Sequence, residues 1–294
     1  IPETEQFRVK PEAVTGIEVL AEAFPAGASA PTQVISEIDK VDEVVSAALG
    51  SPLVASAEIV NQSDSLARID VVLDAEGGSE EAYGAIRELR DSVQAVPGAN
   101  ALVGGDDATR LEVKEAYERD QLLVIPLILV LVFIVLVLLL RALLAPVLLL
   151  ASVVLSFFSA IGAAWLIFQN FFGMSGLDFS VFLFSFLFLV ALGVDYNIFL
   201  VSRAREESAK FANSSDTPTR DAMIVALGST GGVITSAGIL LAAVFAVLGV
   251  LPLIALFQVG IIVGIGVLID TLLVRTVVVP ALAFIAGDRF WWPR

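Results

Sequence analysis

The sequence contains no cysteine and no histidine. Without cysteine it can form neither a disulfide bond nor a thiolate metal site. Without histidine it lacks the commonest metal ligand and the usual proton carrier near neutral pH. We therefore expect no metal centre, and a proton relay would have to use carboxylates, tyrosine, serine, threonine and water. The remaining residues form no convergent nucleophile–base set, so we do not expect an enzyme.

Charged residues are scarce in the second part of the chain. Residues 1–120 contain 24 Asp and Glu and 9 Lys and Arg, whereas residues 121–294 contain 8 of each class. The whole sequence is 57% hydrophobic, above the roughly 45–50% usual for soluble domains. This asymmetry predicts an acidic, water-exposed domain at 1–120 and a neutral transmembrane domain at 121–294. An acidic surface excludes nucleic acid as a partner, and its simplest role is solubility.

Five apolar segments of the second part are long enough to cross a bilayer, which takes about 20 residues. Pro126 and Pro146 fall in or near first turns, where a missing N–H costs little. Trp165 and Trp291–Trp292 fit interfacial aromatic belts, with core packing as the alternative for Trp165. The expected spans are about 122–140, 144–168, 179–202, 222–250 and 253–285.

The distribution of Lys and Arg predicts the orientation. These residues follow the first span at Arg141, the third span at 203–220 and the fifth span in the tail, while the opposite loops 169–178 and 251–252 carry none. Positive loops face the cytoplasm, so residues 1–120 are expected outside a cell membrane that the chain crosses several times. Five spans are an odd number for such an arrangement, so we expect a sixth helix before Ile1. The 203–221 loop serves either as a topology anchor or as an anionic-lipid contact.

The expected extracytoplasmic domain alternates strands and helices. After a helix at 11–24, the patterns predict strands at 33–38, 53–60, 66–73 and 100–103 and helices at 39–49 and 79–96. Asp39 and Ser79 are the candidate N-cap residues of those two helices. The order βαββαβ is ferredoxin-like, an α+β fold that serves many functions. A polar helix at 106–120 leads directly into the first span.

The most informative residue of the membrane domain is Asp195, which precedes Tyr196 inside the 179–202 span. A carboxylate there costs about 2.5–3.5 kcal/mol on insertion scales, so proton traffic is the expected reason for keeping it. Adjacent helical residues point about 100° apart, and both can border a crevice between helices. Removal from water favours the protonated acid, and Tyr196 can exchange hydrogen bonds. The alternative is a satisfied carboxylate that fixes helix packing.

Further residues of the membrane domain fit a supporting role. Gly193 permits close helix approach, and Asn197 could orient Tyr196 or a water molecule. The fourth segment is rich in small and hydroxyl residues, with an expected seam at positions 228, 232, 235 and 239. Its hydroxyls either join the relay or bond back to their own helix. They belong to Ser229, Thr230, Thr235 and Ser236.

The fifth segment contains an acid and a base, Asp270 and Arg275. Five residues correspond to about 140° on an α-helix, so we do not expect them to form a pair within that helix. Asp270 is expected either to pair with another helix or to act as an accessory carboxylate of the relay, and the structural role is favoured.

The stretch Gly193–Glu207, GVDYNIFLVSRAREE, resembles the MMPL (mycobacterial membrane protein large) family, a branch of the resistance-nodulation-division (RND) transporters. Together with the external βαββαβ domain, the matching motifs cover most of the chain. The other motifs are Phe24–Gly27, Arg141–Pro146, Asp270–Arg275 and Trp291–Pro293.

The resemblance implies a fold and a function. Family members have twelve spans in two related halves, each with a porter domain, and this chain resembles the second half, with spans eight to twelve. It implies export of lipids or other hydrophobic molecules driven by the proton gradient, with protons as the coupling ion and no other cofactor. Implied partners are membrane lipids, a hydrophobic substrate and the missing N-terminal half, whose own Asp–Tyr pair would face Asp195 and Tyr196. A homo-oligomer is left open.

A second function stays open beside the exporter. Related bundles with similar external domains act as non-transporting accessories in protein export or as sterol- or lipid-sensing modules. In that case the external surface would matter more than Asp195.

Overall fold

The computed structural model describes residues 2–211 and 217–293, so the part of the 203–221 loop at 212–216 lies outside the described residues. The chain divides into two compact units. The first comprises Ile1–Glu118 with Pro252–Ile254, and the second comprises Arg119–Leu251 with Ala255–Arg294. Within the first unit, Phe7 and Leu253 form a short antiparallel bridge.

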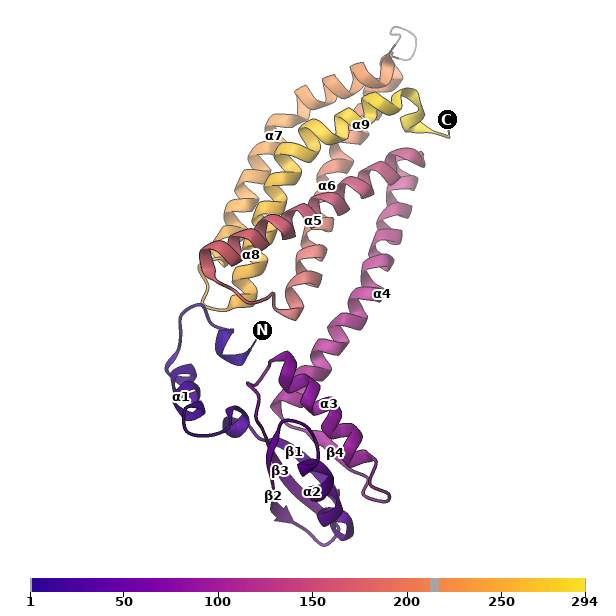
Figure 1. The fold of residues 1–294 in the computed structure, drawn as a ribbon. Coiled ribbons are helices and arrows are strands. Elements are labelled where there is room, and N and C mark those ends of the chain that lie inside the picture. The colour runs from indigo at the N-terminus through magenta and orange to yellow at the C-terminus, as the bar shows by residue number, and fades with distance from the viewer. Residues whose placement is uncertain (1, 212–216, 294) are drawn as a thin grey trace. The chain divides into compact units, whose positions relative to one another are not determined.

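The first unit contains a four-stranded antiparallel sheet. Its strands are β1 (Thr32–Glu37), β2 (Val54–Gln62), β3 (Leu66–Leu73) and β4 (Leu102–Gly104), in the order β2-β3-β1-β4. The helices α2 (Val41–Leu49) and α3 (Glu80–Gln94) connect β1 to β2 and β3 to β4, and α1 (Glu12–Ala21) precedes the sheet (Figure 1). The ferredoxin-like βαββαβ order predicted from the sequence is confirmed.

The core of this unit is formed by alternate residues of its strands and by one face of its helices. Along β3, Ala67, Ile69 and Val71 are buried while the residues between them are more exposed, as the alternation of side chains across a strand requires. Ile86 and Leu89 are fully buried in the same cluster and come from one face of α3. The sheet therefore buries one face against helices.

The two predicted helix caps have different outcomes. The Ser79 hydroxyl oxygen accepts a hydrogen bond from the Ala82 N–H at 3.1 Å, which confirms it as the N-cap of α3. Asp39 is wrong as the N-cap of α2, because it lies inside a 3₁₀ turn, Ile38–Lys40, that precedes the helix. The N-cap position belongs to Lys40, which makes no side-chain cap bond.

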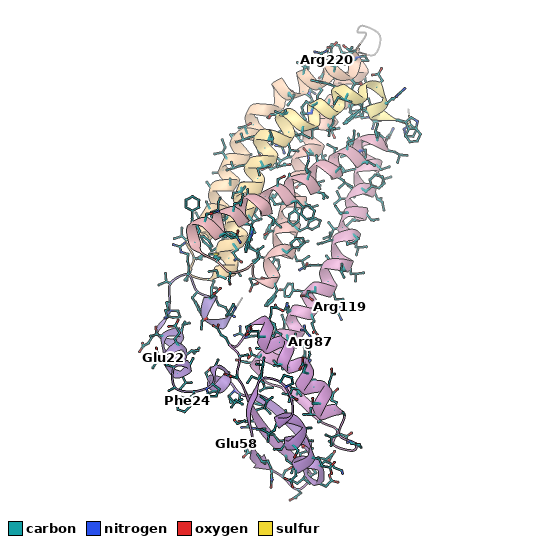
Figure 2. The ribbon with its side chains drawn as sticks, in the orientation of Figure 1. Glu22, Phe24, Glu58, Arg87, Arg119 and Arg220 are labelled. Carbon is teal, nitrogen blue, oxygen red and sulfur yellow. The ribbon has the colours of Figure 1, made fainter. Side chains whose placement is uncertain are left out.

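The last element of the first unit is the beginning of a long helix, α4 (Asp106–Leu140), which continues into the second unit. Ion pairs hold α3 against this beginning: Arg87 contacts Glu115 at 2.9 Å and Arg90 contacts Glu112 at 2.6 Å. Figure 2 labels Arg87 on α3. The polar helix expected at 106–120 and the first span are thus one continuous helix.

Five helices in the described part of the chain are long and apolar enough to cross a membrane, as predicted. The first is α4, followed by α5 (Leu144–Phe172), α6 (Phe179–Phe211) and α7 (Pro218–Leu248). The fifth, over Ile254–Trp291, is composite. It consists of α8 (Ile254–Ile269), a π-helical segment η4 (Asp270–Val278), α9 (Val279–Ala286) and a 3₁₀ turn η5 (Gly287–Trp291). The chain is a multi-pass membrane protein.

Two expectations for this unit require correction. Pro126 does not lie in a first turn, because fusion of the linker helix with the first span places it inside α4; Pro146 is in the first turn of α5 as expected. Trp291 is 2% exposed, and its indole N–H donates to the Thr219 hydroxyl at 3.2 Å, so it belongs to the core. Trp165 also packs against that core, while Trp292 is 59% exposed.

Candidate functional site

One face of α6 is unburied within the second unit. Phe184, Phe188, Ala191, Asp195 and Phe199 are exposed and follow one another at intervals of three or four residues, which places them on one side of the helix. We call these five residues the α6 stripe. Asp195 is the only charged member of an otherwise apolar surface, and it is not buried by any described residue of this chain.

Tyr196 points to a different side of α6. It is half-buried, and its ring lies 4.6 Å from the guanidinium carbon of Arg275. This is cation–π distance. The angle of about 100° between neighbouring positions thus separates the pair: Asp195 lies on the open stripe, and Tyr196 contacts the interior.

The interior contact of Tyr196 belongs to a buried ion pair. Arg275 Nη2 lies 3.3 Å from Asp270 Oδ2, and the two residues are 1% and 4% exposed. The expectation that Asp270 and Arg275 do not pair within their own helix is wrong. Residues 270–278 form a π-helix, whose hydrogen bonds join residues five apart, so Asp270 and Arg275 lie one turn apart on the same face.

Two of the expected supporting residues, Gly193 and Asn197, lie on the face of α6 that is turned toward the Asp270–Arg275 pair. A Cβ atom at Gly193 would be 3.6 Å from Asp270 Oδ1 and 3.4 Å from Val153 Cγ2, which are ordinary van der Waals distances, so Gly193 lies beside Asp270 but the packing there does not require a glycine. Asn197 follows one turn later on the same face and is 1% exposed. Gly193, Tyr196, Asn197, Asp270 and Arg275 are called the buried polar cluster below.

The buried polar cluster is only partly hydrogen-bonded within the described residues. Both side-chain polar atoms of Asn197, one carboxylate oxygen of Asp270, and Nε and Nη1 of Arg275 have no protein partner there. An unsatisfied buried polar group costs about 1–3 kcal/mol. Such a cost in an apolar bundle marks a candidate functional site.

Thr271 and Gly238 were not predicted from the sequence as parts of the site. Thr271 is 1% exposed and follows Asp270 on the π-helical segment. A Cβ atom at Gly238 of α7 would overlap the Thr271 side chain, with Cγ2 only 2.7 Å away. This contact brings α7 against the segment that carries Asp270. The small residues at 228–238 indicated that α7 packs closely against another helix, but they did not show that Gly238 is the point of contact.

The hydroxyls expected on α7 bond mostly within their own helix. Ser229 and Thr230 donate to the Ala226 carbonyl at 3.0 and 2.7 Å, and Ser236 donates to the Val233 carbonyl at 2.9 Å. Thr235 is half-buried. Three of the four predicted residues thus bond back to their own helix, the alternative that the sequence left open.

The seam expected on α7 at positions 228, 232, 235 and 239 is wrong. Position 239 is isoleucine, and Gly228, Gly232 and Ile239 are all exposed. The buried face of α7 instead includes Thr230, Ile234 and Gly238.

Substitution of Gly238 by alanine is expected to destabilise the bundle by about 1–3 kcal/mol, the usual cost of overpacking a core. The added methyl group overlaps Thr271. Thermal unfolding of the purified full-length protein would measure the loss. Gly231→Ala is the matched control, since a Cβ atom there meets nothing within 4 Å and alanine favours helix. Equal melting temperatures for the two variants would contradict this packing.

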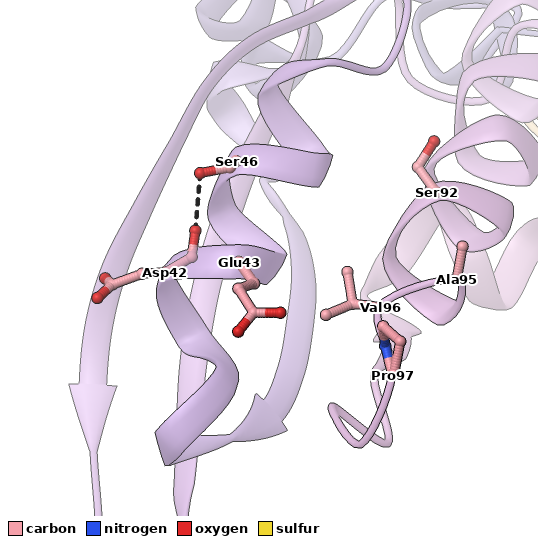
Figure 3. Close-up of a pocket in the computed structure, with 7 residues that line it drawn as sticks. All are labelled: Asp42, Glu43, Ser46, Ser92, Ala95, Val96 and Pro97. Carbon is pink, nitrogen blue, oxygen red and sulfur yellow. Dashed lines mark hydrogen bonds between the residues drawn. The ribbon is translucent and has the colours of Figure 1, made fainter.

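The first unit also contains an open groove of about 550 Å³ between α2 and α3 (Figure 3). Two of its polar side chains have local partners: Glu43 pairs with Lys40 at 2.7 Å, and the Ser46 hydroxyl donates to the Asp42 carbonyl at 2.8 Å. Nowhere in 2–211 or 217–293 do three His, Cys, Asp or Glu residues gather as metal ligands would. The groove therefore adds no second candidate site.

Known proteins match nearly the whole chain. The Streptomyces coelicolor protein SCO0839 is 46% identical over 304 residues, which cover 100% of this chain and 42% of that protein. The apo-petrobactin exporter of Bacillus anthracis is 34% identical over 95% of this chain and 38% of its own length. The acyltrehalose exporter MmpL10 of Mycobacterium tuberculosis is 43% identical over 62% of this chain and 17% of its own length.

The chain spans about two fifths of the length of the first two of these relatives. The sequence model of the MMPL family matches residues 15–294, which include most of the first unit and the whole second unit, with every residue of the buried polar cluster and the α6 stripe. On this match and the relatives above, the chain belongs to the MMPL family.

Proposed function

We propose that this chain is the C-terminal half of an exporter of lipids or other hydrophobic molecules, driven by the proton-motive force through Asp195 and Tyr196. The observation that carries the proposal is the position of Asp195. It is a lone carboxylate on an apolar, unburied helix face, and its neighbour Tyr196 contacts the buried Asp270–Arg275 pair.

The proposed relay uses the two faces of α6 differently. A carboxylate facing lipid would be costly, so the α6 stripe is expected to meet the rest of the transporter, and the N-terminal half supplies that surface. Proton uptake removes the charge of Asp195 and changes which packing of the two halves is favoured. Tyr196, held by Arg275, links that change to the interior of the bundle.

Protons are the only coupling ion in this proposal, and no further cofactor takes part. Membrane lipids and a hydrophobic substrate are the expected partners beside the N-terminal half, and self-association stays a prediction. The names of two relatives support export: one is an apo-petrobactin exporter and another an acyltrehalose exporter. Neither name favours the accessory or lipid-sensing alternative.

Export should depend on both the protein and the proton gradient. In cells that produce the full-length protein, mass spectrometry of lipids in the medium should detect at least one amphiphile that is absent from control cells. A proton uncoupler should return that amphiphile to the control level. Export that survives the uncoupler, or no protein-dependent amphiphile in any growth condition, would contradict the proposal.

A further inference from the structure

A second groove lies at the end of the bundle that the distribution of Lys and Arg assigns to the cytoplasm. It has a volume of about 480 Å³ and lies entirely within the second unit. One wall is the end of α4 and the turn that follows it, and the other is the end of α6. The lining residues are Leu139, Arg141, Ser202, Arg205, Glu206 and Ala209.

The turn presents Arg141 on a fixed backbone. Leu140 and Ala142 on either side are each 1% exposed, and the Leu143 N–H donates to the Trp292 carbonyl at 2.7 Å. Arg141 itself is exposed and has a φ of 40°, in the left-handed region that normally favours glycine or asparagine. Such a conformation is disfavoured for an arginine, a local strain of the kind found at functional sites.

The charges around the groove favour an anion. Two guanidinium groups and one carboxylate line it. That carboxylate, Glu206, is paired with Arg203 at 3.1 Å. No ion pair or hydrogen bond engages Arg141 within the described part of the chain. The Ser202 hydroxyl adds a donor suited to an anionic oxygen.

The groove also has an apolar side that continues along α4. Leu139 lines it and is 49% exposed, and the neighbouring exposed positions Leu131, Val135 and Leu138 follow helical spacing toward the middle of the span. A ligand with an anionic head and a hydrocarbon tail matches both parts. A soluble anion would match only the arginine end.

We propose that this groove binds the phosphate headgroup of an anionic glycerophospholipid from the cytoplasmic leaflet, with its acyl chains along the exposed side of α4. Basic sites at this depth of a membrane protein recognise such headgroups. The site is separate from the Asp195 relay and does not depend on the exported substrate. It would make the lipid composition of the membrane a determinant of how the cytoplasmic ends of α4 and α6 are held.

The test measures lipid binding rather than transport. The full-length protein, purified in a non-ionic detergent, is mixed with dioleoylphosphatidylglycerol or dioleoylphosphatidylcholine, and native mass spectrometry records the bound lipid. An arginine near an anionic headgroup is worth about fivefold in affinity, so the double variant Arg141→Gln/Arg205→Gln, which removes Arg141, should bind phosphatidylglycerol at least about fivefold more weakly. Glutamine leaves the left-handed backbone at 141 no more strained than arginine does, and circular dichroism checks the fold.

The control is Arg289→Gln, which removes one exposed positive charge from the same side of the membrane. It should bind phosphatidylglycerol like the unchanged protein. An equal loss in this control, or no preference of the unchanged protein for phosphatidylglycerol over phosphatidylcholine, would overturn the proposal. A parallel sample with sodium phosphate tests whether the groove binds free phosphate rather than a phospholipid headgroup. Displacement of phosphatidylglycerol by phosphate alone would reject the lipid as ligand.

Discussion

Substitution of Asp195 by asparagine is expected to reduce export to the background level while the protein remains in the membrane. Asparagine keeps the size of the side chain and can still form hydrogen bonds, but it cannot take up and release a proton. Because Asp195 is exposed on the α6 stripe, its substitution breaks no hydrogen bond or ion pair among the described residues. Insertion should become easier, since an intramembrane charge disappears.

Three measurements separate loss of the relay from loss of the protein. Membrane fractionation gives the amount inserted, mass spectrometry of the medium gives export, and a pH-sensitive dye inside proteoliposomes gives proton flux. Asp120→Asn is the matched control, because it makes the same chemical change at the beginning of the first span, away from α6. It should retain both export and proton flux. Normal export by Asp195→Asn would reject the relay.

The fold was largely predictable because its signals are local. In the first unit, strict alternation along β3 and a one-sided apolar face on α3 indicate a sheet covered by helices. In the second unit, five apolar runs exceed the thickness of a bilayer. The exact start and end of a helix were predicted less well, because they depend on the residues outside it. Asp39 fell inside a 3₁₀ turn, and Pro126 fell inside a helix that had been treated as two.

The candidate site was predictable in its residue types but not in its geometry. A charged residue inside a span marks a functional position from sequence alone, and Asp195, Asp270 and Arg275 follow from that rule. Tyr196 was predicted as the neighbour of Asp195. Their arrangement depends on the π-helical segment, which nothing in the local sequence DTLLVRTVV distinguishes from an ordinary helix. Contacts from other helices surround it: Gly193 of α6 beside Asp270 and Gly238 of α7 against Thr271. The contact between Asp270 and Arg275, five residues apart, is therefore visible only in the folded structure.

The second large effect is expected when Arg275 is replaced by methionine. The substitution leaves Asp270 as a buried carboxylate without its cation, and breaking a buried ion pair from one side costs about 3–5 kcal/mol. It also removes the guanidinium from the ring of Tyr196. Unfolding of the full-length protein in mixed micelles of increasing sodium dodecyl sulfate, followed by tryptophan fluorescence, should show this loss. If the variant unfolds at the same fraction of sodium dodecyl sulfate as the unchanged protein, the Asp270–Arg275 pair contributes nothing to the stability of the bundle.

The double variant Asp270→Asn/Arg275→Met tests whether the buried Asp270–Arg275 pair has a structural role only. With both charges removed, no buried ion lacks a partner, so stability should return to within about 1 kcal/mol of the unchanged protein. If the pair is structural, as its burial and its contact with Tyr196 favour, export should return in part, limited by a less well held Tyr196. Export at background in a stable double variant would instead show that the pair takes part in the relay, through Asp270 or through the contact of Arg275 with Tyr196. Asp195→Asn is expected to lose export without losing stability, whereas Arg275→Met is expected to lose stability first. The variants therefore separate the relay carboxylate Asp195 from the buried Asp270–Arg275 pair.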